Sequence, residues 1–208
     1  MTVFAVLVTA GFTASLVWAE VAASPALRWF KMLASTGFIA IALSVGALSS
    51  SYGKVVLVAL VLSWIGDLLL TFSSRQAFLG GLVAFLLGHV AYSVAFGTLG
   101  VDPIVGAISA VVIAIIAVFV WRWLAPHVAD MAGPVVAYVV VISVMVVLAF
   151  GTFGDGATWL IPVGATLFFV SDLFVARNQF VAPGIVNRIW GLPLYYLAQV
   201  LLALSVAS

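Results

Sequence analysis

The chain contains no cysteine, and only 6% of its 208 residues are charged. The lack of cysteine excludes a disulfide scaffold, thiol catalysis and a cysteine-bound metal. A soluble domain carries about a quarter charged residues, so the shortage of charge excludes a water-soluble globule. Seven basic and six acidic residues cannot form the basic surface that neutralises nucleic-acid phosphates. An integral membrane protein remains.

Several catalytic motifs are also missing. The sequence has no G-x-S-x-G run for a serine hydrolase and no G-x-x-x-x-G-K loop for phosphates. It has only two histidines, too few for a three-histidine zinc site. We therefore expect no cofactor and no metal. A Mg²⁺ or Ca²⁺ site made by Glu20, Asp67 and Asp172 is an alternative.

Long hydrophobic runs dominate the sequence, in which 66% of residues are hydrophobic. A membrane-spanning helix needs about 20 mainly apolar residues, and charges, prolines, glycines and serines divide the chain into such runs. The predicted spans are approximately 2–22, 28–48, 54–73, 77–98, 103–124, 132–151, 157–176 and 188–207. The connections are too short for another domain. The sequence predicts one all-α domain over residues 1–208, a compact bundle of about eight transmembrane helices.

The basic residues favour one side of this bundle. On that side lie the connections that carry or adjoin Arg28, Lys31, Arg75, Arg122, Arg177 and Arg188. The other side has Lys54 alone among the basic residues. By the positive-inside rule, we expect a multi-pass inner-membrane protein with both termini away from the cytoplasm.

Two segments of the sequence resemble each other. Residues 65–70 and residues 170–175 are both apolar runs around a small residue and an aspartate. They lie about half the chain apart, and each precedes an arginine and another span. We interpret this as a four-plus-four internal duplication of residues 1–100 and 101–208, with parallel repeats.

Asp67 and Asp172, the aspartates of these segments, are the predicted catalytic residues. A charge inside a span is costly by several kcal/mol and marks a functional candidate. Both aspartates are expected near the cytoplasmic ends of their spans. Two carboxyl groups held close together do not ionise readily at once, so one can donate a proton while the other acts as a base. Which aspartate is the acid is left open. The structural alternative is that both tie helices together.

Further polar residues recur at helical spacing and at similar depth, so they should point into the bundle. We expect them to line a polar cavity open toward the cytoplasmic leaflet and to bind substrate. These candidates are Glu20, Lys31, His89, Tyr92, Tyr138, Tyr195, Tyr196 and Gln199. As alternatives, Lys31 extends to the headgroups, the tyrosines belong to an aromatic belt, and His89 is a satisfied interior histidine.

Ordered blocks of the sequence resemble the YhhN family, bacterial relatives of the transmembrane lysoplasmalogenases. The blocks are Lys31 and residues 63–70, 78–92, 164–172 with Asn178, and 192–199. The resemblance covers essentially the whole chain and adds Asn178 to the candidate substrate-binding residues.

The resemblance implies hydrolysis of the vinyl ether bond of a lysoplasmalogen. The products would be a fatty aldehyde and glycerophosphocholine or glycerophosphoethanolamine. The two aspartates suit this reaction, which needs a proton delivered to an alkene carbon and then an attack by water. The expected partners are a lysophospholipid substrate and the bilayer; the sequence predicts no oligomeric state.

Two other functions fit parts of the sequence. Duplication with charges inside the membrane is also typical of small transporters, so a lipid or solute transporter or binding protein is one alternative. A metal-dependent lipid amidase or phosphatase is the other.

Overall fold

The computed structural model describes residues 2–207, which form helices and connections with no strand. The prediction of an all-α bundle is confirmed. The eight α-helices are α1 (Thr2–Val21), α2 (Leu27–Ser44), α3 (Ser51–Leu69), α4 (Arg75–Gly97), α5 (Pro103–Leu124), α6 (Ala132–Gly154), α7 (Leu160–Ala176) and α8 (Ile185–Leu204). Five residues of π-helix, Arg177–Val181, continue α7.

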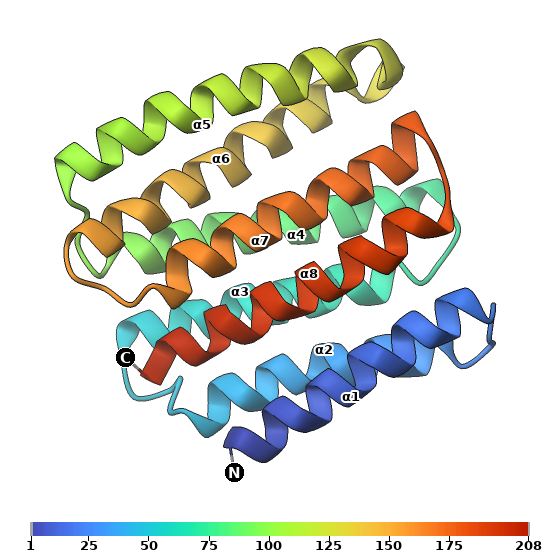
Figure 1. Ribbon diagram of the computed structural model, residues 1–208, viewed down its shortest axis with the longest axis horizontal. Coiled ribbons are helices and arrows are strands. Elements are labelled where there is room, and N and C mark those ends of the chain that lie inside the picture. The colour runs from blue at the N-terminus through green and yellow to red at the C-terminus, as the bar shows by residue number, and fades with distance from the viewer. Residues whose placement is uncertain (1, 208) are drawn as a thin grey trace.

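Successive helices run in opposite directions (Figure 1). The connections 22–26, 70–74, 125–131 and 182–184 therefore lie together at what we call the basic end, because most arginines are beside them. The start of α1 and the end of α8 lie at the opposite end, with the connections 45–50, 98–102 and 155–159.

Side chains cap three of the helices. The Ser50 hydroxyl accepts a hydrogen bond from the backbone of Gly53 before α3, and Ser74 does the same before α4. The Asp102 carboxylate accepts bonds from two backbone N–H groups at the start of α5. Ser and Asp are favoured at this position because they satisfy N–H groups that have no partner within the helix. The caps fix where these spans begin.

Seven of the eight helices within residues 2–207 are long and apolar enough to cross a membrane. The exception is α2, which carries Arg28 and Lys31 in its first turns and ends at Ser44. Its predicted span reached residue 48. The helix ends earlier because Gly46 adopts a left-handed backbone, with φ of 91°, and the Ala47 N–H bonds back to the Ala42 carbonyl. This is the common glycine-based helix ending.

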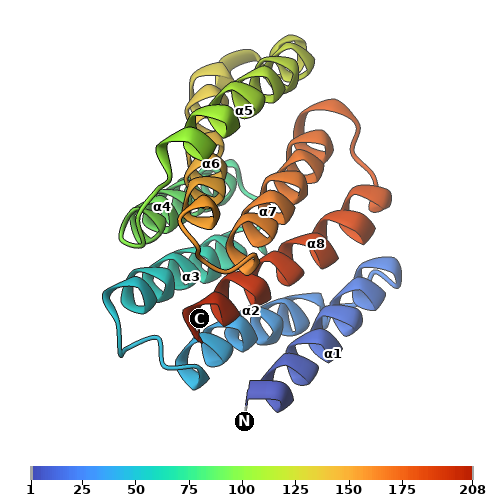
Figure 2. The same ribbon diagram turned by 60° about the vertical axis from the view of Figure 1, so that its left-hand side comes forward.

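Helices adjacent in sequence pack in pairs: α1 with α2, α3 with α4, α5 with α6, and α7 with α8. The halves of the chain interlock because α2 also packs on α8, and α4 on α6. The outermost helices, α1 and α5, lie at the two edges of the bundle (Figure 2). Each half therefore repeats the same helix contacts, as a duplication would produce; the duplication itself stays a prediction.

Glycines permit the closest helix approaches beside the candidate site. A Cβ atom on Gly66 would lie 2.6 Å from the ring of Phe85, and one on Gly164 would lie 2.8 Å from Leu202. Membrane helices commonly pack closely through such small residues. Gly66 precedes Asp67, so this contact brings α4 against α3 next to the predicted catalytic carboxyl.

Candidate active site

Asp67 lies two residues before the end of α3, and both oxygens of its carboxylate have partners. The ammonium group of Lys31 is 3.3 Å from Oδ1. The hydroxyls of Ser35 and Tyr195 both donate to Oδ2, each at 2.7 Å. The residue is only 3% exposed. One cation and two hydroxyls thus offset the cost of burying this carboxylate.

Tyr196 contacts two of these partners, Ser35 and Lys31. Its hydroxyl lies 3.0 Å from the Ser35 hydroxyl oxygen and donates to the backbone carbonyl of Lys31 at 3.2 Å. Lys31, Ser35, Tyr195 and Tyr196 with Asp67 form the Asp67 cluster. Its members come from α2, α3 and α8, so the cluster joins the two halves of the chain.

Asp172, on α7, has a different environment. The Tyr138 hydroxyl donates to Oδ2 at 2.8 Å, and His89 Nε2 is 3.6 Å from the same oxygen, too far for a hydrogen bond. No residue of 2–207 donates to Oδ1. The Asp172 side chain is 17% exposed, whereas that of Asp67 is 4% exposed. Asp172, Tyr138 and His89 form the Asp172 cluster.

His89 is buried without a hydrogen-bond partner. Its side chain is 1% exposed, and within the described chain neither ring nitrogen makes a hydrogen bond. Aromatic rings hold the imidazole in place: Tyr138 at 5.2 Å and Phe168 at 4.5 Å between centroids. Buried polar groups are normally bonded, so the unpartnered imidazole of His89 beside a carboxyl group is a candidate for a functional residue.

Phe168 separates the two clusters. Its ring lies 4.5 Å from the His89 ring and 5.3 Å from the Tyr195 ring. No hydrogen bond within residues 2–207 joins the two carboxyl groups. Tyr92 also lies beside this ring, and its buried hydroxyl donates a hydrogen bond of 2.6 Å to Gln199 Oε1. The aspartates therefore form two centres one aromatic ring apart.

Besides Tyr92 and Gln199, two more predicted binding residues lie outside both clusters. Glu20 pairs with Arg188 at 2.7 Å at the basic end. Asn178, in the π-helical turn, accepts hydrogen bonds from the backbone of Gly184 and the amide of Asn187. Neither residue contacts Asp67 or Asp172, and Asn178 orders the connection between α7 and α8.

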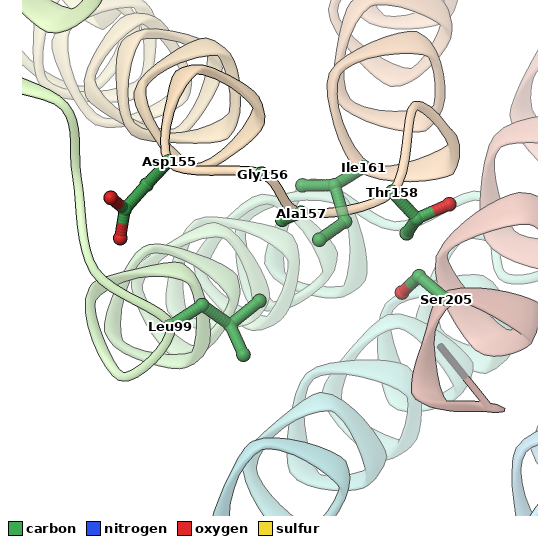
Figure 3. A pocket seen from close by; sticks show the side chains of 7 residues that line it. All are labelled: Leu99, Asp155, Gly156, Ala157, Thr158, Ile161 and Ser205. Atoms are coloured by element: carbon green, nitrogen blue, oxygen red, sulfur yellow. The ribbon is translucent and has the colours of Figure 1, made fainter.

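Many polar groups of the spans find partners within the bundle. Several hydroxyls in the spans donate to carbonyls of their own helices, including those of Thr9, Thr13 and Ser63, a common way of satisfying hydroxyls in membrane helices. A cavity of about 450 Å³ lies at the opposite end (Figure 3). It is lined by Leu99, Asp155, Gly156, Ala157, Thr158, Ile161 and Ser205, none of them a predicted site residue.

Within residues 2–207, no three acidic or histidine side chains gather closely enough to hold a metal ion. The alternative metal ligands Glu20, Asp67 and Asp172 do not lie together, because each contacts a different set of residues. Lys31 and the hydroxyl donors already occupy Asp67.

Sequence reasoning missed two residues of this site. Ser35 stands one turn after Lys31, which was a usable signal, but it was not among the candidates. Phe168 gave no signal, because an aromatic residue in an apolar span is normally lipid-facing or core. Its role between the clusters is visible only after α4, α7 and α8 have packed.

The YhhN family model matches residues 26–206. The chain belongs to the YhhN family. Both clusters lie within the matched range, whereas Glu20 precedes it. This confirms the family resemblance that the sequence blocks indicated.

Characterised proteins with similar sequences are named lysoplasmalogenases. The chain is 33% identical over 157 residues to lysoplasmalogenase TMEM86A of Bos taurus, covering 72% of this chain and 64% of that protein. It is 34% identical over 152 residues to lysoplasmalogenase TMEM86B of Sus scrofa, covering 72% and 62%. The chain thus spans less than two thirds of the length of these relatives. No solved structure matches it.

Proposed function

We propose that this YhhN-family membrane protein hydrolyses the vinyl ether bond of a lysoplasmalogen. Its relatives support a lysoplasmalogenase-like hydrolase at the level of the family. The observation that carries the assignment is the Asp172 cluster. There a partly exposed carboxyl group with one unbonded oxygen meets a buried imidazole without a hydrogen-bond partner. This arrangement can exchange a proton with a bound molecule.

Asp172 is the proton donor in this proposal. Its protonated carboxyl group gives a proton to the alkene carbon farther from the ether oxygen, which leaves an oxocarbenium ion. Water then adds to the carbon next to the oxygen and returns a proton to the Asp172 carboxylate. The resulting hemiacetal breaks its carbon–oxygen bond to release a fatty aldehyde and the glycerol hydroxyl. A positioned acid contributes about 10²–10⁴ in rate to such a step.

Asp67 acts as the fixed negative charge. Its ion pair with Lys31 and its two hydroxyl donors occupy both oxygens, so it is not free to exchange protons. A preorganised charge in a medium of low dielectric constant stabilises an opposite charge that develops nearby. Because its pair with Lys31 is neutral overall, Asp67 would favour the oxocarbenium ion, whose formation is the difficult step, as the negative end of an oriented dipole.

The remaining candidates act in positioning and binding. Tyr138 orients the Asp172 carboxyl group through its hydrogen bond, and His89 orients the attacking water. Tyr92, bonded to Gln199, packs against the Phe168 ring between the two clusters. Tyr196 holds Ser35 and Lys31 in the Asp67 cluster. Glu20 and Asn178 lie at the basic end, where the headgroup of the lipid would be, and the Glu20–Arg188 pair offers both charges to a zwitterionic headgroup.

The proposed orientation places the basic end at the cytoplasmic face of the inner membrane, with both termini on the other side. The clusters then lie in the cytoplasmic half. Asp67 is two residues, and Asp172 four residues, from the basic end of its α-helix. A single-chain lipid in the inner leaflet would bring its ether bond to this depth.

The assignment is tested by incubating the purified protein, in lipid nanodiscs, with 1-alkenyl lysophosphatidylethanolamine. Mass spectrometry should detect a released long-chain aldehyde. Asp67→Asn and Asp172→Asn should each abolish its release, and Asp155→Asn at the opposite end should retain it. No aldehyde from the wild type, or full turnover by either Asn variant, would overturn the assignment. Transport of the intact lipid without cleavage would favour the transporter alternative, and turnover that requires an added metal would favour the amidase or phosphatase.

A further inference from the structure

A lipid-facing groove of about 320 Å³ lies between α4 and α6. Its walls include Val90, Ser93 and Val94 from α4, and Val140, Val144 and Leu148 from α6. All of these side chains are apolar except that of Ser93, whose hydroxyl already donates to the backbone carbonyl of His89. The groove therefore offers no free hydrogen-bond donor and suits a hydrocarbon occupant.

The residues at one margin of the groove are close in sequence to members of the Asp172 cluster. Val90 follows His89 in α4, and Val140 lies two residues after Tyr138 in α6. The rings of His89 and Tyr138 contact each other between the same two helices. Tyr138 also donates a hydrogen bond to Asp172. The polar cluster thus adjoins the margin of the groove that faces the basic end.

The length of the groove along the helices fits a lipid chain. An α-helix rises about 1.5 Å per residue, so Tyr138 and Leu148 are separated by roughly 15 Å along α6. That is about half of the hydrocarbon thickness of a bilayer. A chain lying there would run from the depth of the Asp172 cluster through the middle of the membrane.

We propose that the groove between α4 and α6 holds the hydrocarbon chain of the substrate, with the bond next to the headgroup at Tyr138 and Asp172. This inference rests on the proposed function. In a lysoplasmalogen, the reactive bond is the first bond of the chain, between the polar glycerol and the apolar tail. The structure has the same order: a charged basic end, then the Asp172 cluster, then an apolar groove.

The proposal predicts a dependence on chain length. Because the chain enters the groove from lipid and not from water, each added methylene group should raise kcat/KM only through packing against the groove walls, and the gain should stop where the chain reaches the end of the groove. Val144→Trp should fill the middle of the groove. It should lower kcat/KM for a long-chain alkenyl lysolipid by about tenfold or more and leave a four-carbon analogue unaffected.

Val118→Trp is the matched control, because Val118 is a lipid-facing valine on α5, 56% exposed against 47% for Val144. It should alter neither rate. An equal loss for both chain lengths in Val144→Trp, or no loss for either, would overturn the proposal.

A second measurement does not depend on hydrolysis. A non-cleavable 1-alkyl lysophosphatidylethanolamine with a diazirine in mid-chain is photolysed with the protein in phosphatidylcholine vesicles. Labelled peptides should map to residues 90–94 and 140–148, and unlabelled alkyl lysolipid should compete the label away. Label spread over all lipid-facing helices without competition would contradict the groove. If the unlabelled lipid competes the label away but the alkenyl lipid releases no aldehyde, the groove binds lipid chains and the proposed hydrolysis is rejected.

Discussion

Asp67 and Asp172 occupy matching places in the two halves of the chain, but their surroundings differ. Each lies near the basic end of the third helix of its half, α3 or α7. Asp67 receives partners from α2 and α8, whereas Asp172 receives them from α6 and α4. In both cases one partner helix, α2 or α6, is the second helix of the same half as the aspartate. The other, α8 or α4, is the fourth helix of the opposite half.

The chemistry in these two matching places differs. Asp67 has a cation and two hydroxyls, and its side chain is 4% exposed. Asp172 has one hydroxyl, a nearby imidazole and an oxygen without a partner, and its side chain is 17% exposed. A buried carboxylate that is fully bonded is a structural charge. One that is partly bonded and reachable can exchange protons. This difference supports the proposal that the half containing α7 provides the reactive carboxyl group and the half containing α3 provides the fixed one.

The sharpest test of this division is Asp172→Asn, which removes the proton donor while it preserves size and polarity. We expect aldehyde release to fall by about 10²–10⁴, with little change in thermal stability. Activity and Tm are measured on the same purified sample. Asp155→Asn, an exposed change at the opposite end, serves as the control. Retention of activity here, with loss in Asp67→Asn, would reverse the proposed roles.

Asp67→Asn should affect folding as well as activity. It leaves the Lys31 ammonium group, whose side chain is only 12% exposed, without its carboxylate. Breaking a buried pair costs about 3–5 kcal/mol, and because Lys31 can extend toward the basic end, we expect about 3 kcal/mol. The double variant with Lys31→Met should recover part of this loss. Thermal unfolding in detergent measures both effects. If Asp67→Asn unfolds no more easily than Asp172→Asn, the two carboxyl groups do not differ as proposed.

A matched pair of hydroxyl deletions compares the clusters directly. Tyr138→Phe removes the only hydroxyl donor to Asp172, so we expect activity to fall by about tenfold. Tyr195→Phe leaves Lys31 and Ser35 on Asp67, so it should cost about 1.5 kcal/mol in stability and less activity than Tyr138→Phe does. Initial rates and Tm values of both variants provide the comparison. The opposite order of activities would show that Asp67 performs the proton transfer.

The fold was largely predictable because lipid imposes strict demands on the chain. Each span needs a long apolar run with all backbone groups bonded internally, which makes the spans visible in hydropathy. The ends of helices are less visible. The early end of α2 depends on the backbone of Gly46, and the predicted span continued past it because residues 45–48 are themselves mostly small or apolar.

Residues of the candidate site could be picked out where a polar group inside a span is costly in free energy. That cost marked Asp67, Asp172 and Lys31. The partnership between residues was not predictable, because helical spacing gives the face of a helix but not which helix it meets. The approach of Tyr195 in α8 to Asp67 in α3 depends on how the two halves interlock. Glu20 was assigned to the site by its depth, but α1 places it against Arg188 instead.

An exposed ion pair at the basic end provides the smallest and final test of the comparison. Arg75 pairs with Asp130, and their side chains are 70% and 67% exposed. Surface pairs contribute about 0–1 kcal/mol, so Asp130→Asn should lower stability by no more than about 0.5 kcal/mol and leave aldehyde release unchanged. This pair and the Lys31–Asp67 pair have the same charges, so the difference between the two variants in Tm isolates the effect of burial. An equal loss of Tm in both variants would mean that charge pairing near the basic end, rather than burial, accounts for the stabilising role given to Asp67.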